Sequence, residues 1–292
     1  MLGRFLAESS YAPISEAFAP VNVTIADLSL DASWLTAKDL DRAAAILDWH
    51  GVVVLNGLID PALSDAARHE ADALVARVEQ AVASPFDHGQ TGNMLWQVGG
   101  ALFCGHKAIL AQGRPLANLR SRERGTTNGG LIDFFFLDRA AHENRWNALN
   151  ACCGVLKSPP LAQIIAAISP AKPQQVNMLR NDSVTATRGL HIDNLDFSYK
   201  AFLYLSDVCG PKDGPYAYVP GSHHRPDLLK REARLNSLNG RPETDSYAFE
   251  GREINFPVKR GTVIISCQSG VHRGMPQQEG ASRTVLVGNY RA

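Results

Sequence analysis

The spacing of hydrophobic residues predicts one long helix and one buried strand near the start of the chain. The stretch from Asp60 to Ala83 has apolar residues on one helical face, at positions 63, 67, 71, 74 and 78. Asp60 followed by Pro61 is typical of an N-cap and a first helical residue. Before this helix, HGVVVLNGL is a valine-rich run bounded by glycines, which predicts a buried strand.

From about residue 175 the pattern changes to short apolar or alternating runs that are separated by turn residues. The runs are QVNMLR, KAFLYLSDV, YAYVPGS, GTVIISC and SRTVLVGNY. Strands at this spacing, without helices between them, predict an antiparallel sandwich or jelly roll rather than a parallel sheet.

Composition and charge narrow the function classes. The chain has 292 residues, of which 45% are hydrophobic, and no repeat or linker marks a domain boundary, so we expect a single domain over 1–292. The formal net charge is zero, which gives no field that favours nucleic acid or an anionic membrane. No apolar run approaches ~18 residues and no signal peptide is present, so we expect a cytoplasmic protein. Five cysteines without a C-x-x-C spacing indicate reduced thiols.

A histidine and an aspartate stand two residues apart in GLHIDNLD. In an extended segment, His191 and Asp193 point to the same side, so both can contact one ion. Two ligands do not complete a metal site, and the candidates for a third are His223, His224 and His272. A hydrogen-bonded pair without metal is the alternative that this motif leaves open.

Arg283 is the second unusual position. Alternation in SRTVLVGNY places it on the same strand face as Val285 and Val287. A buried guanidinium is costly unless a carboxylate or a phosphate meets it, and no acid of the chain is an obvious partner by spacing. A bound dicarboxylate would satisfy it, whereas an edge strand would let the side chain reach solvent.

Taken in order, these segments resemble the phytanoyl-CoA dioxygenase-like branch of the iron(II)- and 2-oxoglutarate-dependent oxygenases. The resemblance rests on HID, AFLYLSDV, DGPYAYVPGSHH and GTVIISCQSGVHRG, followed by Arg283, and on HGVVVLNGLID before a helix. It implies a mostly β fold with flanking helices, a double-stranded β-helix of the jelly-roll, cupin-like type. The β-helix would occupy about 175–292, with an N-terminal strand and helix at 45–84.

The same resemblance implies a chemistry. His191, Asp193 and His272 would form the two-histidine, one-carboxylate triad on ferrous iron, with three adjacent positions open. In the family, 2-oxoglutarate fills two of these positions and its far carboxylate pairs with the arginine, here Arg283. Molecular oxygen is the other cosubstrate, and 2-oxoglutarate becomes succinate and CO2 while the substrate is oxidised, most often by hydroxylation. Asn177, on the preceding strand, is a further candidate for cosubstrate binding.

The primary substrate is less defined. Family members act on acyl-CoA, amino acids, sugars and secondary metabolites, so we expect a small molecule without naming one. Segments 84–158 and 222–258 are long and poor in strand patterns, and we expect them to cover the mouth of the barrel. The candidates for substrate contact are Trp96, Tyr204, Arg180 and Arg273.

Two other functions remain open at this stage. One is a non-catalytic or regulatory protein that binds a metal or a metabolite. The other is a zinc or cupin-type metalloenzyme that uses His223 or His224, which would have no use for Arg283. The sequence carries no signal for an oligomeric state.

The chain departs from the family pattern at Gly274. A hydroxyl residue often stands at this position after the distal histidine, and the glycine removes one possible hydrogen bond to 2-oxoglutarate.

Overall fold

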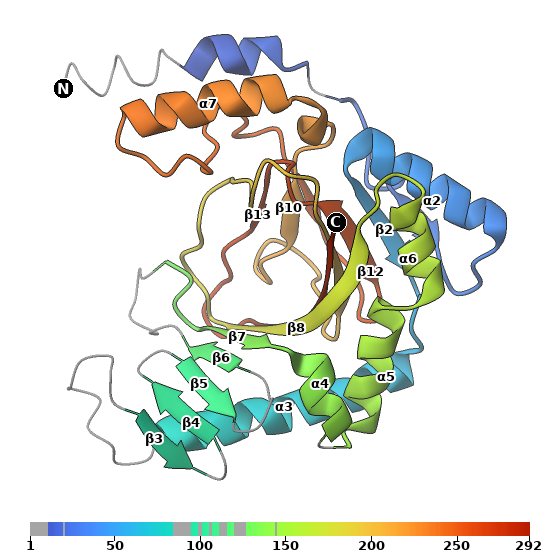
Figure 1. Cartoon of the computed structure of the whole chain (residues 1–292), viewed down its shortest axis with the longest axis vertical. Helices are drawn as coiled ribbons and strands as arrows, with labels where there is room; N and C mark the ends of the chain where they lie inside the picture. The colour runs from blue at the N-terminus through green and yellow to red at the C-terminus, as the bar shows by residue number, and fades with distance from the viewer. Residues whose placement is uncertain are drawn as a thin grey trace.

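Two β-sheets of unequal size form the centre of the protein (Figure 1). The computed structural model describes residues 11–19, 21–83, 95–98, 101–104, 107–110, 116–119, 127–143 and 145–292, and it describes no side chains between residues 77 and 126. Within these ranges, the larger sheet has 11 strands in the order β1-β2-β12-β9-β14-β8-β7-β6-β5-β4-β3, and the smaller has three in the order β11-β10-β13. β1 runs parallel to β2, and the other pairs are antiparallel.

The strands follow the chain in numerical order. They are β1 (Ser29–Asp31), β2 (Val52–Asn56), β3 (Leu95–Val98), β4 (Ala101–Cys104), β5 (Lys107–Leu110), β6 (Leu116–Leu119), β7 (Leu131–Phe135), β8 (Lys172–Asp182), β9 (Tyr199–Tyr204), β10 (Tyr216–Tyr218), β11 (Ile254–Phe256), β12 (Val263–Cys267), β13 (His272–Gly274) and β14 (Ser282–Arg291).

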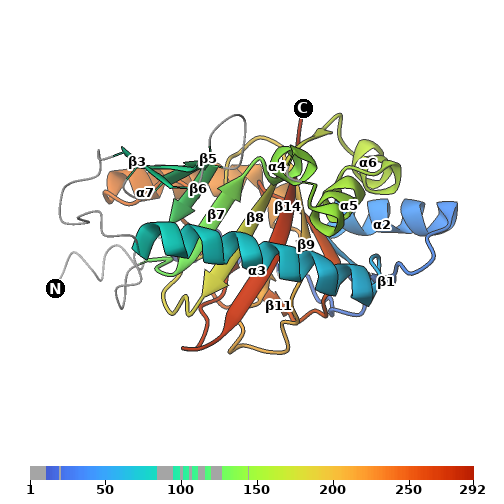
Figure 2. The same cartoon turned by 90° about the horizontal axis from the view of Figure 1, so that it is seen from below.

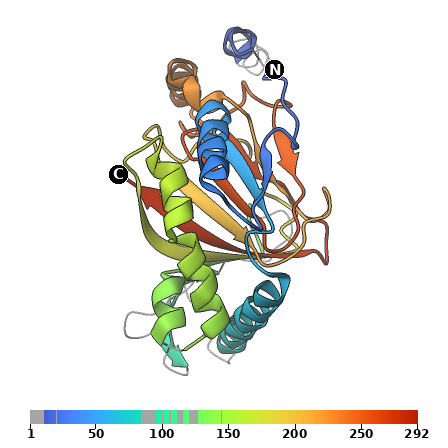
Figure 3. The ribbon, with the colours of Figure 1, turned by 90° about the vertical axis from the view of Figure 1, so that its right-hand side faces the viewer.

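Helices surround these sheets. They are α2 (Ala37–His50), α3 (Pro61–Ala83), α4 (Leu137–Glu143), α5 (Asn147–Leu156), α6 (Pro159–Ala166), the short 3-10 helix η1 (Ser222–His224) and α7 (Pro226–Leu238), and residues 11–17 are also helical. Figure 2 shows α3 crossing the strands β8, β14 and β9. In the side view of Figure 3, α2 covers β2, and the N-terminal helix lies near α7. Among the described residues, no helix is long and apolar enough to cross a membrane.

Side chains on the central strands of the larger sheet alternate between two buried faces. On the outer face, Leu203 of β9 and Leu286 of β14 pack with apolar residues of the surrounding helices. On the inner face, Tyr204 and Val285 pack with residues of the smaller sheet, such as Tyr216. The two faces of the same strands therefore belong to different cores, one between sheet and helices and one between the two sheets.

Several expectations from the sequence are confirmed. The strand at 52–56 and the helix at 61–83 are present, and the Asp60 carboxylate accepts a hydrogen bond from the Ala62 N–H at 2.7 Å, as an N-cap does. All five runs after residue 175 form strands, namely β8, β9, β10, β12 and β14. The expectation of no helix among them is wrong, because α7 lies between β10 and β11.

Segment 84–158 forms strands although its sequence is poor in strand patterns. That segment contains β3 to β7, which extend the larger sheet beyond β8. Each of these strands has only four or five residues, which is too short for alternation to be recognised in the sequence. Coverage of the barrel mouth by 84–158 stays a prediction.

Candidate metal centre

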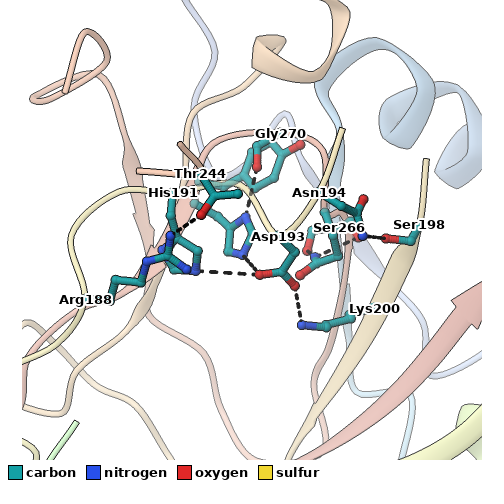
Figure 4. Close-up of polar contacts among 12 residues, drawn as sticks. Arg188, His191, Asp193, Asn194, Ser198, Lys200, Thr244, Ser266 and Gly270 are labelled. Atoms are coloured by element: carbon teal, nitrogen blue, oxygen red, sulfur yellow. Dashed lines mark hydrogen bonds and ion pairs between the residues drawn. The ribbon is translucent and has the colours of Figure 1, made fainter. Parts of the chain in front are cut away.

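Two segments that lie far apart in the sequence bring three side chains together beside the smaller sheet. The Nε2 atoms of His191 and His272 each lie 3.7 Å from Oδ1 of Asp193 (Figure 4). One ligand atom from each of the three residues lies within 4.8 Å of the others, and no other trio of His, Cys, Asp or Glu in the described part of the chain has this property. His272 was one of three candidates for the third ligand, and the fold brings it, rather than His223 or His224, to the HID motif.

Backbone hydrogen bonds hold the HID segment at each residue. His191 and His272 exchange N–H to C=O bonds of 2.9 Å, the Ile192 N–H donates to the Thr244 carbonyl, and the Asp193 N–H donates to the Gln268 carbonyl. Ile192 is buried behind the motif in a cluster with α7 and the N-terminal helix, as its alternation with the two ligands predicts. The motif is therefore fixed between β13 and the loop that follows α7.

That loop is itself held by a buried carboxylate. Glu232 of α7 is 2% exposed, and it accepts hydrogen bonds from the Ser246 hydroxyl and from the backbone N–H groups of Tyr247 and Ala248. Asp245, which pairs with His191 in an isolated bridge, also forms an ion pair with Arg188 at 2.6 Å. Part of segment 222–258 thus borders the centre, and its action as a cover stays a prediction.

The two imidazoles are oriented by carbonyl groups two residues before them. His191 Nδ1 donates to the Gly189 carbonyl at 2.8 Å, and His272 Nδ1 donates to the Gly270 carbonyl at 2.9 Å. This arrangement orients both rings with Nε2 facing Asp193. Burial, together with the neighbouring His272 ring, lowers the pKa of His191 to about 4, so its ring is neutral near pH 7.

Asp193 is ionised in this environment. Burial alone would raise the pKa of its carboxyl group, but the His272 ring and the Lys200 ammonium outweigh burial and hold that pKa well below its usual range. Lys200 Nζ lies 2.5 Å from Asp193 Oδ2. Two imidazole nitrogens and one carboxylate oxygen therefore converge, and this donor set suits a divalent transition metal.

Arg283 lies on the inner face, as alternation predicts. It is 7% exposed, and its neighbours on that face of β14 are Val285 and Val287. Its Nε has no hydrogen-bond partner, and no carboxylate within the described ranges forms an ion pair with it. Burial lowers the pKa of Arg283, partly offset by Tyr204. The guanidinium is thus a buried cation that the described part of the chain does not neutralise.

The position of Gly274 shows where Arg283 lies relative to the candidate metal centre. His272 and Gly274 are two residues apart on β13, so they face the same side of the strand. A Cβ atom at Gly274 would lie 3.5 Å from a terminal nitrogen of Arg283. The guanidinium therefore lies next to the inner side of β13, about two residues along the strand from a proposed metal ligand.

Two further predicted residues lie on the same inner face as Arg283. Asn177 pairs with Val287 across β8 and β14, and its Oδ1 accepts a hydrogen bond from the Phe136 N–H at 3.2 Å, which leaves the amide N–H groups available. Tyr204 is 2% exposed, and burial raises the pKa of its hydroxyl to about 12. Contact of Asn177 and Tyr204 with a bound molecule stays a prediction.

Other candidates from the sequence lie elsewhere. Arg180 is on the outer face, where Thr284, Asp182 and Asp72 accept its hydrogen bonds, so it cannot contact a substrate on the inner face. Arg273 has an unpartnered Nε and a weak contact of 3.4 Å to Thr187. Trp96 belongs to β3, but its side chain lies outside the described structure.

His223 and His224 do not join the metal centre. Their Nε2 atoms lie 2.9 and 2.7 Å from the same acceptor, the backbone carbonyl of Asp48 at the end of α2. Cys152, Cys153, Cys209 and Cys267 are free thiols, as expected. The side chain of Cys104 lies outside the described structure.

Two groups near the ligands had not been singled out from the sequence. Lys200 is one, although alternation in KAFLY places it on the same face as Phe202 and Tyr204. The other is a buried network in which Tyr216 and Gln268 both bond the Ser266 hydroxyl, at 2.9 and 2.8 Å. No sequence signal marks this network, because its members come together only when β10 and β12 face each other.

A hollow opens beside Asp193. A cavity of about 250 Å³ is lined by Asp193, Lys200 and Asn289 among others. A second cavity of about 730 Å³ adjoins it and shares Asn194, Ser198, Tyr199 and Arg291 with it. A volume of this size is in the range of small-molecule sites.

Comparisons with known proteins bear on the fold. No model of a known protein family and no curated protein matches the chain. Among solved structures, the non-heme alpha ketoglutarate dependent epimerase SnoN from nogalamycin biosynthesis matches with a TM-score of 0.52 and 17% identity, over 87% of this chain and 81% of SnoN. HygX from Streptomyces hygroscopicus with iron bound matches with a TM-score of 0.52 and 16% identity, over 88% and 86% of the two chains. The chain shares their fold.

A third match supports the same conclusion. AviO1 from Streptomyces viridochromogenes Tue57 has a TM-score of 0.50 and 18% identity, over 88% of this chain and 97% of AviO1. At such identities the likeness concerns the fold alone. The sheet-rich architecture with flanking helices is thus one that 2-oxoglutarate-dependent enzymes use.

Proposed function

We propose that this protein is an Fe(II)- and 2-oxoglutarate-dependent oxygenase of the phytanoyl-CoA dioxygenase-like family, which oxidises a small-molecule metabolite. The two sheets would be the double-stranded β-helix of that family, within a single domain over 1–292. The observation that carries the proposal is the convergence of His191, Asp193 and His272 near a buried arginine that has no carboxylate partner in the described part of the chain.

The donor set fits ferrous iron. His191 and His272 would each offer a neutral Nε2, and Asp193 would offer a carboxylate oxygen, because the Nδ1 atoms are occupied by the Gly189 and Gly270 carbonyls. Three protein ligands of this kind leave positions on the metal for other molecules. A structural zinc site would instead use four protein ligands, and no fourth His, Cys, Asp or Glu joins the group within the described residues.

The surroundings also fit 2-oxoglutarate. Two residues along a strand span about 6.6 Å, which is comparable with the length of a five-carbon dicarboxylate. A cosubstrate with its keto acid end at the metal could therefore place its far carboxylate at Arg283. Gly274 supplies no hydroxyl group, but the absence of its side chain leaves room for this contact. Asn177 and Tyr204 would contribute hydrogen bonds from β8 and β9.

The protein would control the reaction by orienting 2-oxoglutarate and by excluding water from the site. Iron with 2-oxoglutarate and molecular oxygen supplies the oxidising power, and 2-oxoglutarate leaves as succinate and CO2. Arg283 would neutralise and orient the far carboxylate, while Phe202, Val285 and Val287 keep water from that end of the site. The cavities beside Asp193 would admit the primary substrate. Hydroxylation is the simplest outcome, but SnoN is described as an epimerase, so product analysis should include other oxidations.

The two alternative functions differ in how well they agree with the positions of these residues. A zinc or cupin-type enzyme that uses His223 or His224 does not agree with the geometry, because both rings bind the Asp48 carbonyl instead. A non-catalytic metabolite-binding protein would use the same centre, and only turnover distinguishes it from an oxygenase.

Succinate formation tests the proposal directly. The purified protein is incubated with ferrous iron, 2-oxoglutarate and oxygen, and succinate is measured with and without a panel of small molecules. We expect slow succinate formation that requires iron, and faster formation with a compound that is the substrate or resembles it. Binding of 2-oxoglutarate without succinate under every condition would favour the non-catalytic alternative, and absence of 2-oxoglutarate binding would refute the proposal.

A further inference from the structure

Lys200 is placed to control how Asp193 meets a metal. Its Nζ contacts Oδ2 of Asp193 at 2.5 Å, while Oδ1 of the same carboxylate lies 3.7 Å from both histidine Nε2 atoms. Figure 4 shows Lys200 and His191 on different sides of the Asp193 carboxylate. The two oxygens of Asp193 therefore have separate partners, one cationic side chain and one pair of imidazoles.

The position of Lys200 is set by the sheet rather than by a flexible surface loop. β9 lies between β12 and β14, and Lys200 pairs in register with Ser266 on one side and Asn289 on the other. Its side chain is 30% exposed and that of Asp193 is 29% exposed, and both line the smaller cavity. By contrast, Lys259 is 77% exposed and lies 3.9 Å from Asp207, as in an ordinary surface pair.

We infer that Lys200 is a positioning residue that keeps Asp193 a one-oxygen ligand. This inference rests on the proposed function. A carboxylate binds a metal through both oxygens only if both can face it, and the ammonium holds Oδ2 away from the imidazoles. A second metal–oxygen bond would occupy one of the positions that 2-oxoglutarate and oxygen need. Lys200 thereby preserves open positions without contacting the metal.

This role gives a signature that general damage would not produce. Lys200→Met removes the charge and the donor but keeps an unbranched side chain of similar length. Metal affinity should stay equal or increase, because Asp193 gains a free oxygen and a cation is removed from beside a divalent ion. Affinity for 2-oxoglutarate on the metal-loaded protein should fall by roughly tenfold, because the carboxylate competes for one position.

The first measurement counts the open positions without any cosubstrate. The protein is loaded with Mn(II), and water-proton relaxation reports how many water molecules bind the ion. Three protein ligand atoms on a six-coordinate ion leave about three waters, and four leave about two. Relaxivity should therefore fall by roughly a third in Lys200→Met. Lys200→Arg, which keeps a cationic donor, should stay near wild type, and Lys259→Met is the matched control.

The second measurement is an anaerobic titration of 2-oxoglutarate into the Fe(II)-loaded proteins, followed by the metal charge-transfer absorbance. Weaker 2-oxoglutarate binding in Lys200→Met, with metal affinity retained, supports the inference. Unchanged relaxivity overturns it, as does parallel loss of metal and 2-oxoglutarate affinity, which indicates a merely structural lysine. If the wild-type protein shows no 2-oxoglutarate band, the proposed function fails, and the Mn(II) measurement still decides the role of Lys200.

Discussion

Both faces of the central strands pack against buried apolar side chains, but their arginines have different surroundings. On the outer face, Arg180 of β8 donates to Asp72, Asp182 and Thr284. On the inner face, Arg283 of β14 has no ion-pair partner within the described ranges, and its Nε has no hydrogen bond. The two arginines are close in the same sheet, since Thr284 pairs with Arg180 and Arg283 pairs with Asn181. One arginine is satisfied within the fold, and the other has no carboxylate partner among the described residues.

The difference between the two arginines indicates that the outer face serves stability and that the inner face has another role. A buried charge without a partner costs free energy, so the inner face is not arranged for the stability of the protein alone. Proteins tolerate such costs where a ligand provides the missing partner. We therefore expect substitutions on the outer face to change stability, and substitutions on the inner face to change metal and cosubstrate binding.

The largest expected effect is at the metal ligands. His191→Ala or His272→Ala leaves two protein ligands on the ion, so iron-dependent succinate formation should fall to background while circular dichroism shows an intact fold. His69→Ala is the matched control, because this exposed histidine of α3 lines neither cavity. Wild-type turnover in either ligand variant would show that the metal is held elsewhere.

The next effect is at Arg283. Loss of a desolvated guanidinium–carboxylate contact costs about 2 to 5 kcal/mol, so Arg283→Ala should weaken 2-oxoglutarate binding by roughly 30-fold to several thousand-fold. Arg283→Lys should recover part of this loss, because an ammonium keeps the charge but not the planar fork. An anaerobic titration of the iron-loaded proteins measures both. Equal affinities in wild type and Arg283→Ala would place the far carboxylate at another residue.

A stability measurement sharpens the contrast between the two arginines. Arg283→Met removes an unpaired buried cation, so the metal-free protein should unfold at the same or a higher urea concentration than wild type. Arg180→Met breaks satisfied hydrogen bonds to charged groups and should cost about 1 to 3 kcal/mol, without changing 2-oxoglutarate affinity. The comparison between the faces is wrong if both variants lose stability and 2-oxoglutarate binding alike.

The outer face should respond to loss of apolar volume alone. Leu286 is 0% exposed and lies between two inward-facing valines on β14. Leu286→Ala should lower the free energy of unfolding by about 2 to 5 kcal/mol through the cavity that it leaves. The folded fraction should still bind 2-oxoglutarate with wild-type affinity at low temperature. A large loss of that affinity would mean that packing against the helices also shapes the inner face.

Alternation and motif order made much of this site predictable from sequence. The HID spacing pointed to two of the three side chains that converge, and the strand pattern of SRTVLVGNY placed Arg283 among inward valines. The same reasoning applied to KAFLY would have placed Lys200 on the inner face. His223 and His224 could not be assigned in this way, because their partner is a backbone carbonyl 175 and 176 residues away. The strands β3 to β7 were missed because each is too short to show a period.

His223 provides the last test, since it is a buried polar group that belongs to neither face. It is 4% exposed, its Nε2 donates to the Asp48 carbonyl, and its Nδ1 has no partner. Burial lowers the pKa of His223 to about 4, with smaller contributions from His224 and His50, and against the effect of the Asp48 carbonyl. If an unpartnered buried atom alone marked a functional site, His223→Gln should impair turnover. We expect it not to, because the glutamine amide can still donate to the Asp48 carbonyl.

The consequence of this histidine should instead be a pH-dependent stability. The folded-state pKa lies below the ordinary value of about 6.5, so between about pH 6.5 and pH 4 the unfolded chain binds a proton that the folded protein does not. The contribution of neutral His223 is therefore complete above about pH 6.5 and is lost as the pH falls, on the order of 2 kcal/mol by pH 5. Urea unfolding of the metal-free protein at pH 7 and pH 5 measures this loss. His223→Gln should lose less stability over that interval than wild type. Identical pH dependence in wild type and His223→Gln would mean that His223 takes up its proton in the folded protein as readily as in the unfolded chain.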